Sequence, residues 1–321
     1  MPTVTTAARL HFGFQNLSLA HARLYGGVGL ALDEPQLVVE AKRADVVECD
    51  DPAVEGYLRR VVDTLDVPGA SVTVHERFPR HVGLGSGTQL ALAALIAVVR
   101  AYDRTADART VAPQLGRGGR SGVGVATFER GGFVVDGGHP TERFTAEPPA
   151  DGDWDVPPVI ASHDVPADWR FVLVVPDTET GQSGSEEDSN MRTAVERADP
   201  GIADQISTLL TRRLLPAMAT RDRRRFGGAA ARLGRLNGAW YADEQGGVYR
   251  PPAGSIVEHL ADVPTITGAG QSSWGPAVWG LTDTDGIDAA KEAGYAALSA
   301  AGVGGDVHVV APRNTGASLT E

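Results

Sequence analysis

The sequence predicts an α+β protein built from two halves. Strand-like and helix-like stretches stand on both sides of a connector at residues 145–168, which holds five prolines and indicates extended chain. A glycine-rich loop at residues 83–87 leads into an apolar run at residues 90–99, which predicts a buried helix. The 321 residues suffice for two domains, and we expect these at 1–165 and 166–321.

The first half opens with strands and then alternates helices with strands. Residues 3–14 alternate loosely between apolar and polar side chains, which is typical of a half-buried strand. The other strands expected here are 26–32, 37–43 and 70–76, and the expected helices are 50–65, 90–102 and 109–116. Nine glycines between residues 115 and 139 are interleaved with valine and phenylalanine, which indicates tight turns and close backbone contacts.

The second half carries longer helical patterns. The strands expected here are 171–175, 265–267 and 306–310, and the expected helices are 202–219, 221–241, 256–262 and about 285–301. Residues 177–190 form an acidic stretch rich in glycine and serine, for which we expect a loop.

Composition excludes several classes of protein. The chain is 42% hydrophobic and 22% charged, as expected of a globular protein, and its net charge of −12 disfavours a general nucleic-acid binder. A single cysteine, Cys49, excludes a disulfide within the chain. No signal peptide is visible and the longest apolar run is too short to span a bilayer. We therefore expect a cytoplasmic protein with neither a membrane nor a nucleic acid as its partner.

The basic residues are almost all arginine. Only Lys42 and Lys291 are lysines, so 27 of the 29 basic residues are arginines. An acidic chain with few lysines is typical of a GC-rich, salt-adapted source such as a halophilic archaeon. Codon bias alone would explain the preference for arginine but not the excess of acidic residues.

The glycine-rich loop is the first candidate binding site. Glycines allow a ligand to approach the backbone, and the free N–H groups at the start of a helix attract anions, most often phosphate. Hydroxyl and amide side chains add hydrogen-bonding groups, although a helix cap without a ligand requires the same residue types. The candidate substrate-binding residues here are Gly83, Gly85, Ser86, Gly87, Thr88 and Gln89.

The run from Pro79 to Gln89 resembles the second motif of the GHMP kinase superfamily, and its spelling Gly-Leu-Gly-Ser-Gly-Thr-Gln is similar to that of the β-ribofuranosylaminobenzene 5′-phosphate synthase family. The resemblance extends from Arg9 to Pro312, with three separated motifs in the same order. It implies a GHMP two-domain architecture, with an N-terminal half like ribosomal protein S5 domain 2 and a ferredoxin-like C-terminal half. It also implies a homodimer.

The N-terminal hairpin carries the next candidates. Arg9 and His11 share one face of the expected strand, and Arg23 precedes two glycines, an arrangement suited to an anionic small molecule. The synthase family has a similar Arg-Leu-His-Phe and Arg-x-x-Gly-Gly pattern. At Asn16 that pattern leads us to expect an aspartate, so part of the family chemistry is in question. We predict Arg23 and Asn16 as catalytic and Arg9 and His11 as substrate-binding, with Arg23 gripping a carboxylate.

A second segment argues against kinase activity. GHMP kinases carry Ser-Gly-x-Asp, in which the aspartate is the catalytic base, whereas this chain has Gly124 at the matching position after Ser121 and Gly122. The synthase resemblance continues to Asp136 and His139, which we predict as catalytic, although a polar turn would use the same residues.

Two further stretches complete the predicted site. The third GHMP-like motif supplies the substrate-binding candidates Gly268, Gly270, Gln271, Ser272, Ser273 and Trp274. Trp274 could stack on an aromatic ring or simply pack. Glu186 and Glu187 could ligate Mg²⁺ through their carboxylates, although a solvated acidic loop is the simpler interpretation at this net charge.

The resemblance implies a transferase, specifically a pentosyltransferase, acting on phosphoribosyl diphosphate and an aromatic carboxylate, 4-aminobenzoate or 4-hydroxybenzoate. Diphosphate leaves C1 of the ribose, the ring carbon bearing the carboxylate attacks C1, and CO₂ departs, as in methanopterin biosynthesis. Mg²⁺ and helix-terminal N–H groups would neutralise the diphosphate. The alternatives are an ATP-dependent GHMP small-molecule kinase and a phosphometabolite-binding protein without catalysis.

Overall fold

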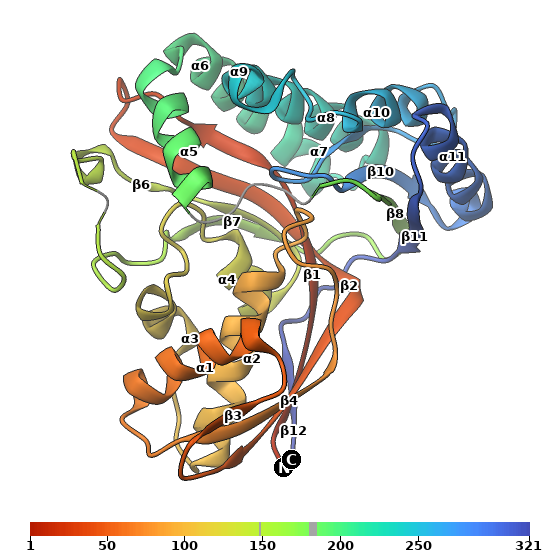
Figure 1. Cartoon of the computed structure of the whole chain (residues 1–321). Coiled ribbons are helices and arrows are strands. Elements are labelled where there is room, and N and C mark those ends of the chain that lie inside the picture. Colours follow the sequence, from red (N-terminus) through yellow and green to blue (C-terminus); the bar gives the residue numbers. More distant parts are fainter. Residues whose placement is uncertain (148, 180–184) are drawn as a thin grey trace.

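The computed structural model describes residues 1–147, 149–179 and 185–321, without the side chains of residues 53 and 185–187. It contains two sheets with helices packed on them (Figure 1). Within the described residues, no helix has both the length and the apolar character needed to cross a membrane.

The first sheet is organised by one long antiparallel pair. β1 (Thr3–Asn16) pairs with β2 (Arg23–Arg43) along almost its whole length, with two shifts of register. The two strands expected at 26–32 and 37–43 are one strand of 21 residues. β1 pairs with both ends of it and shifts register between them, while Asp33 in the polar middle exchanges hydrogen bonds with Ala311. The remaining strands of this sheet are β3 (Val47–Cys49), β4 (Ala70–Glu76), β5 (Phe133–Asp136), β6 (His139–Pro140), β7 (Val159–His163) and β12 (Ser318–Thr320).

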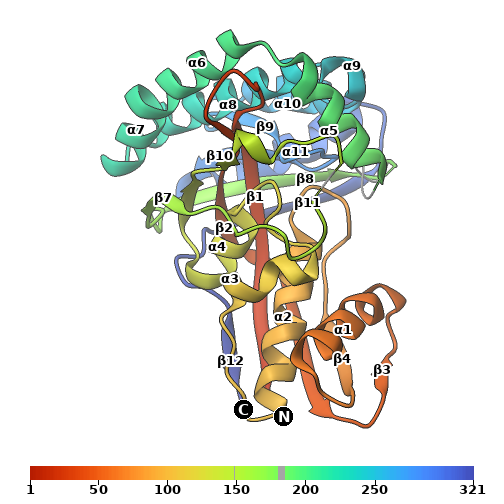
Figure 2. The same cartoon turned by 90° about the vertical axis from the view of Figure 1, so that its left-hand side faces the viewer.

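The helices of the first half lie against this sheet. They are α1 (Pro52–Leu65), α2 (Ser86–Ala101), α3 (Ala108–Val111) and α4 (Val123–Arg130), with 3₁₀ turns η1 (Ala112–Leu115) and η2 (Thr141–Arg143). α2 runs along β1 and β2 (Figure 2) and begins four residues before the predicted start. α4 was not expected, because glycines at 122 and 124 mask a helix whose apolar side chains are buried.

The second sheet is antiparallel, in the order β11-β8-β10-β9. Its strands are β8 (Trp169–Pro176), β9 (Ala269–Gln271), β10 (Val278–Asp283) and β11 (Gly305–Val310). The strand expected at 265–267 thus begins later, at Ala269. The helices are α5 (Ser185–Arg197), α6 (Pro200–Leu209), a π-helical turn η3 (Leu210–Leu214), α7 (Leu215–Ala219), α8 (Arg223–Trp240), α9 (Ala242–Gln245), α10 (Ala253–Ala261), the 3₁₀ turn η4 (Thr284–Gly286) and α11 (Ile287–Ala300).

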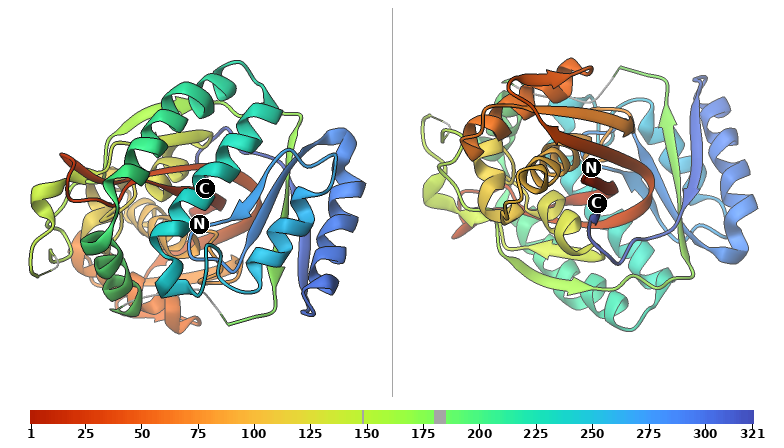
Figure 3. Two further views of the ribbon diagram at one scale, coloured as in Figure 1. Left: turned by 90° about the horizontal axis from the view of Figure 1, so that it is seen from above. Right: turned by 90° about the horizontal axis from the view of Figure 1, so that it is seen from below.

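The two halves share a core. Phe226 of α8 packs edge-on against Phe12 of β1 and Phe133 of β5, and Trp279 of β10 packs against Phe12. Seen from above, the green and cyan helices form a layer over the molecule (Figure 3). β12 returns from the second half to pair with β1, so the termini lie side by side at one end (Figures 1 and 2). Residues 145–168 do not serve only as a connector between the halves, because β7 within this segment pairs with β5 in the first sheet.

Candidate active site

A cavity of about 810 Å³ lies where the glycine-rich loop, the loop before α4, the residues after β6, the start of α5 and the loop after β9 converge. Its described lining is rich in arginine: Arg9, Arg60, Arg117, Arg120, Arg143 and Arg192. Three acidic residues, Glu147, Asp151 and Asp188, also line it. In a chain of net charge −12, this concentration of arginine indicates an anionic ligand.

The glycine-rich loop is held in place by the strand behind it. Gly85 has a φ of 84° and caps α2, so the first turn of the helix opens towards the cavity. The Arg9 side chain donates to the carbonyl of Gly83 at 2.6 Å, and the Ser272 hydroxyl donates to the same carbonyl at 2.8 Å. Ser86, Gly87 and Thr88 line the cavity at this helix end. Free backbone N–H groups at such an end bind anions.

Arg117 adds a positive charge beside this helix end. Its guanidinium lies 4.7 Å from the ring centre of Tyr57 and also hydrogen-bonds to the Tyr57 hydroxyl. A Cβ at Gly87 would lie 3.3 Å from that hydroxyl and 3.4 Å from Arg117 Nη1, so the glycine leaves room for both side chains. The α2 N-terminus and Arg117 together form the first anion-binding region, which we call the loop subsite.

Aromatic rings form another part of the cavity wall. His11, Phe14, Tyr25 and His139 follow one another with ring centres 5.0, 5.7 and 6.4 Å apart. Burial raises the pKa of Tyr25, while Arg120, Arg192 and Arg143 act in the opposite direction. The rings therefore stand beside positive charges, as an aromatic anion would require.

His139 is held as a neutral imidazole. An arginine can only donate, so Arg143 Nη1, 2.6 Å from His139 Nδ1, makes that nitrogen the acceptor. The other nitrogen, Nε2, then donates to the carbonyl of Gly118 at 3.0 Å. Burial, assisted by the charge of Arg143, lowers the pKa of His139 to about 4. Apart from His139, no hydrogen-bond or ion-pair partner of Arg143 is found among the described residues, so its other donors are open to a ligand. We call Arg143 and the four rings the aromatic subsite.

Asp136 lies behind the cavity wall. Its side chain is fully buried and accepts hydrogen bonds from the backbone N–H groups of Gly122 at 2.7 Å and Gly138 at 2.9 Å. The Ser121 hydroxyl donates to it at 3.2 Å, and His11 Nε2 lies 3.2 Å from the same hydroxyl. Burial raises the pKa of Asp136 to about 6, although these hydrogen bonds act to lower it. The predicted residue Asp136 therefore reaches the cavity only through Ser121.

The structure brings together ten of the residues predicted from the sequence. Those that line the cavity are Arg9, His11, Gly83, Gly85, Ser86, Gly87, Thr88, His139, Ser273 and Trp274. Five arginines of the lining were missed. Arg117 and Arg120 lie in the glycine-rich stretch at residues 115–139, and this position could have identified them as candidate binding residues. Arg60, Arg143 and Arg192 reach the cavity from α1, η2 and α5 and had no local signal.

Arg23, predicted to grip the carboxylate, lies outside the cavity. Its side chain is exposed and absent from the cavity lining, and its guanidinium donates to the carbonyls of Gly137 and Gly138. The Asn16 side chain is buried and donates to the carbonyls of Ser18 and Arg23, both at 2.8 Å. Both residues shape the turns that flank the cavity, because backbone carbonyls in these turns need donors.

Several glycine-motif residues also serve packing. Gln89 is fully buried, accepts from Thr6 at 2.5 Å and donates to the carbonyl of Gly124 at 2.9 Å, so it ties α2 to α4 behind the loop. Of the third motif, Gly268, Gly270, Gln271 and Ser272 lie outside the cavity lining. A Cβ at Gly268 would lie 2.1 Å from a backbone oxygen of α8, so close packing explains that glycine.

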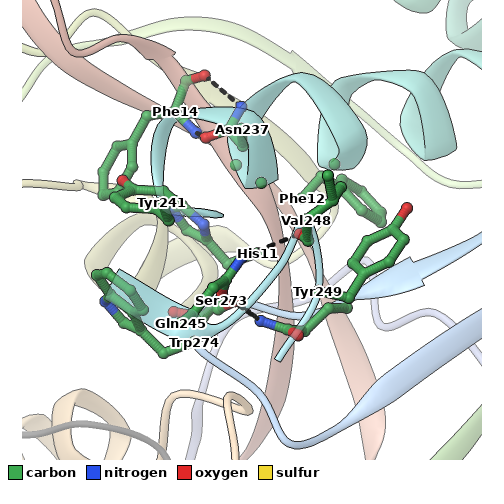
Figure 4. A pocket seen from close by; sticks show the side chains of 14 residues that line it. His11, Phe12, Phe14, Asn237, Tyr241, Gln245, Val248, Tyr249, Ser273 and Trp274 are labelled. Carbon is green, nitrogen blue, oxygen red and sulfur yellow. Dashed lines mark hydrogen bonds between the residues drawn. The ribbon is translucent and has the colours of Figure 1, made fainter. Parts of the chain in front are cut away.

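Trp274 has a packing partner of its own. A small pocket of about 40 Å³ adjoins the cavity and is lined by His11, Phe14, Asn237, Tyr241 and Trp274 among others (Figure 4). The rings of Trp274 and Tyr241 are 4.5 Å apart, and Trp274 is 8% exposed. The pocket is about large enough for one water molecule and too small for an aromatic substrate.

The side chains of Glu186 and Glu187 lie outside the described residues. Across the residues that the structure does describe, no three His, Cys, Asp or Glu side chains are grouped to hold a metal ion. Asp188 lines the cavity and lies 3.6 Å from Arg120. Mg²⁺ is often bound through one or two carboxylates and the phosphates of a substrate, so this lining fits an ion that arrives with its ligand.

Comparison with known proteins identifies relatives over most of the chain. Residues 52–132 match the GHMP kinases N terminal domain. The chain is 33% identical over 297 residues to the β-ribofuranosylphenol 5′-phosphate synthase of Methanothermobacter thermautotrophicus, covering 87% of this chain and 88% of the relative. It is 32% identical to the protein of the same name from Archaeoglobus fulgidus, covering 89% of each.

The fold agrees with a GHMP two-domain architecture, as expected. Mevalonate diphosphate decarboxylase from Staphylococcus aureus superimposes with a TM-score of 0.68 at 13% identity, covering 100% of this chain and 99% of the other. This similarity concerns the fold alone.

Proposed function

Since this chain belongs to the family of the β-ribofuranosylphenol 5′-phosphate synthases, within the GHMP superfamily and of pentosyltransferase type, we propose the following reaction for it. The enzyme transfers ribose 5-phosphate from phosphoribosyl diphosphate to 4-hydroxybenzoate or 4-aminobenzoate, with release of CO₂ and diphosphate. The phenol in the relatives' name favours the hydroxybenzoate, because loss of its carboxylate leaves a phenol.

The arginine-rich cavity is the observation that carries this proposal. The donor brings a diphosphate and a monophosphate, and the acceptor brings a carboxylate on an aromatic ring. The cavity offers six arginines, a helix N-terminus and a wall of aromatic rings. We assign the donor's diphosphate to the loop subsite and the acceptor to the aromatic subsite, where its carboxylate meets Arg143. Substrates that fill this positively charged cavity would also exclude water from the oxocarbenium-like centre.

The residues at position 124 and around it disfavour a kinase. Gly124 lines the cavity, and a Cβ there would lie only 3.1 Å from Thr88 Cγ2. An aspartate side chain at position 124 would therefore crowd Thr88, and the glycine present there supplies no base. The proposed transfer needs no strong base at this position, because loss of CO₂ restores the aromatic ring.

Product analysis tests the proposal directly. We expect the purified protein to release labelled CO₂ from carboxyl-labelled 4-hydroxybenzoate or 4-aminobenzoate when phosphoribosyl diphosphate and Mg²⁺ are present. With ATP and mevalonate, homoserine or galactose we expect no ADP above background. Substrate-dependent ADP without CO₂ would establish the kinase instead, and ligand binding without any product would establish a binding protein.

We also propose that Mg²⁺ binds together with the donor, phosphoribosyl diphosphate. When bound, it would neutralise charge that develops on the leaving diphosphate. Among the described residues Asp188 could contribute a carboxylate, and Arg117 with the α2 N–H groups would bind the remaining phosphate oxygens.

Ser86 provides a test of the loop subsite. Ser86→Ala removes a hydroxyl from the first turn of α2 without altering buried packing, since Ser86 is only partly buried. We expect the dissociation constant for phosphoribosyl diphosphate to rise at least about tenfold, because a hydrogen bond to a charged group contributes about 1.5–3 kcal/mol. Titration calorimetry measures this, and unchanged donor affinity would show that the hydroxyl does not contact the donor.

A further inference from the structure

Ser121 connects the cavity to a buried carboxylate. Ser121 lines the cavity, and its hydroxyl donates to Asp136 at 3.2 Å, accepts from the backbone N–H of Val123 at 3.2 Å and lies 3.2 Å from His11 Nε2. Asp136 is itself absent from the cavity lining and fully buried. Among the described residues, the Ser121 hydroxyl therefore links the cavity to Asp136.

Gly27 leaves the space in which the side chains of Ser121 and Asp136 meet. A Cβ at Gly27 would lie 2.1 Å from Ser121 Oγ and 2.9 Å from Asp136 Oδ2, so any larger residue would separate them. The backbone N–H groups of Gly122 and Gly138 fix the two carboxylate oxygens. The position of the carboxylate is thus determined by the backbone on both sides.

We propose that Ser121 and Asp136 form a proton relay for the acceptor's ring substituent, and that this relay suits the enzyme to a phenolic acceptor. This inference rests on the proposed function. In the relay Ser121 is the catalytic residue, because it touches the substrate, while Asp136 and His11 act through it.

The reaction gives such a relay a defined task. As ring carbon 1 bonds to C1 of the ribose and the bond from C1 to diphosphate breaks, a phenolic acceptor becomes positively charged at its hydroxyl. The phenolic hydroxyl takes the place of His11 at Ser121 Oγ, whose other lone pair accepts from the N–H of Val123. The phenolic proton then passes to Ser121 Oγ while the Ser121 proton passes to Asp136, which leaves a dienone that still carries the carboxylate. The bond to the carboxylate then breaks, its electron pair restores the aromatic ring, CO₂ leaves, and the proton returns to the phenolate oxygen along the same path.

An acceptor with a dialkylated nitrogen does not need this proton transfer. Nitrogen holds the positive charge of the intermediate more readily than oxygen, and 4-(dimethylamino)benzoate has no proton on its nitrogen to lose. Comparing the two acceptor types therefore shows whether the Ser121 hydroxyl transfers a proton or has only a structural role.

The groups around Asp136 make it a suitable base near neutral pH. Burial raises the pKa of Asp136 to about 6, which matches general-base work near that pH. His11, beyond Ser121, stays neutral because burial, with Arg9 and Arg120, lowers its pKa to about 3. Arg23 holds the carbonyls of Gly137 and Gly138 beside Asp136. Activity with a phenolic acceptor should thus fall as the pH drops through about 6, where Asp136 takes up a proton.

The test compares Ser121→Ala with the wild type on both acceptors. With 4-hydroxybenzoate we expect CO₂ release at saturation to fall at least about 100-fold, the range of general acid–base effects, and with 4-(dimethylamino)benzoate less than about threefold. As a matched control, Ser86→Ala removes another cavity hydroxyl and should affect both acceptors equally. In the pH profile with 4-hydroxybenzoate, the decline below about pH 6 should vanish in Ser121→Ala; this readout does not depend on the dimethylated analogue being accepted.

The outcomes distinguish the relay from the proposed function. Equal losses on both acceptors, or an unchanged decline below pH 6 in Ser121→Ala, would overturn the relay and leave the transfer reaction in place. No CO₂ release by the wild type with either natural acceptor would overturn the proposed function, and the relay with it. Circular dichroism of Ser121→Ala, which we expect to match the wild type, excludes loss of the fold as the cause.

Discussion

Replacing Arg143 by glutamine should raise the KM for the aromatic acceptor at least about 30-fold, about 2 kcal/mol, while the KM for phosphoribosyl diphosphate changes less than about threefold. Arg143 stands at the end of the aromatic wall, and of the described residues only His139 binds it. A planar guanidinium can grip a benzoate carboxylate with two parallel hydrogen bonds, which glutamine cannot reproduce. Glutamine is two bonds shorter than arginine, so the variant also removes the donor to His139 Nδ1.

Two controls separate this role from a general effect of charge. Arg213→Gln removes the same charge from an exposed position in η3 and should leave both KM values unchanged. Arg143→Lys keeps the charge but loses the bidentate geometry, and we expect an intermediate rise in the acceptor KM. Steady-state kinetics with each substrate varied in turn measures these effects. If Arg143→Gln raises only the donor KM, then Arg143 binds phosphate and the assignment of the subsites is reversed.

Gly83→Ala should destabilise the protein by about 3 kcal/mol or more and abolish donor binding. Gly83 has a φ of 91°, which costs alanine about 1–2 kcal/mol, and its new Cβ would lie 2.2 Å from the backbone oxygen of Ser272. A side-chain rotation cannot relieve contact with backbone, so the loops of the two halves would have to separate, as in overpacked cores. Arg9 and Ser272 both donate to the Gly83 carbonyl and would lose that bond.

Chemical denaturation and calorimetry test this prediction together. The matched control is Gly228→Ala, at an exposed position in α8 where a Cβ meets nothing within 4 Å. That variant should be more stable by up to about 1 kcal/mol, because alanine favours helix more than glycine does. A Gly83→Ala protein with wild-type stability and donor affinity would mean that the two loops do not need this close contact.

Much of the fold could be predicted from local pattern. The strand at residues 70–76 and the helices near 50–65 and 285–301 lie close to their predicted bounds, because each has a clear apolar period. The helix α4 and the single long strand β2 could not be predicted in this way. Glycines obscure the first, and the polar middle of the second pairs with a segment distant in the sequence, at Ala311 and Pro312.

The candidate site divides along a similar line. The sequence by itself determined the glycine-rich loop before a buried helix, the glycine at 124 where kinases carry a base, and the strand that carries Arg9 and His11. Each of these features involves residues that are close together in the chain, so their type and spacing can be read directly from the sequence.

Only the tertiary structure decided which charged side chains face the cavity. Arg23, the sequence's candidate for the carboxylate, turns outward to backbone carbonyls, whereas Arg143 and Arg192 converge on the aromatic wall from η2 and α5. Asp136 and Ser121 meet because β5 and the start of α4 are brought together against β2, where Gly27 leaves the space. The physical reason is that a long side chain takes its partner from whatever the packed backbone places within reach, and that placement depends on residues distant in the chain.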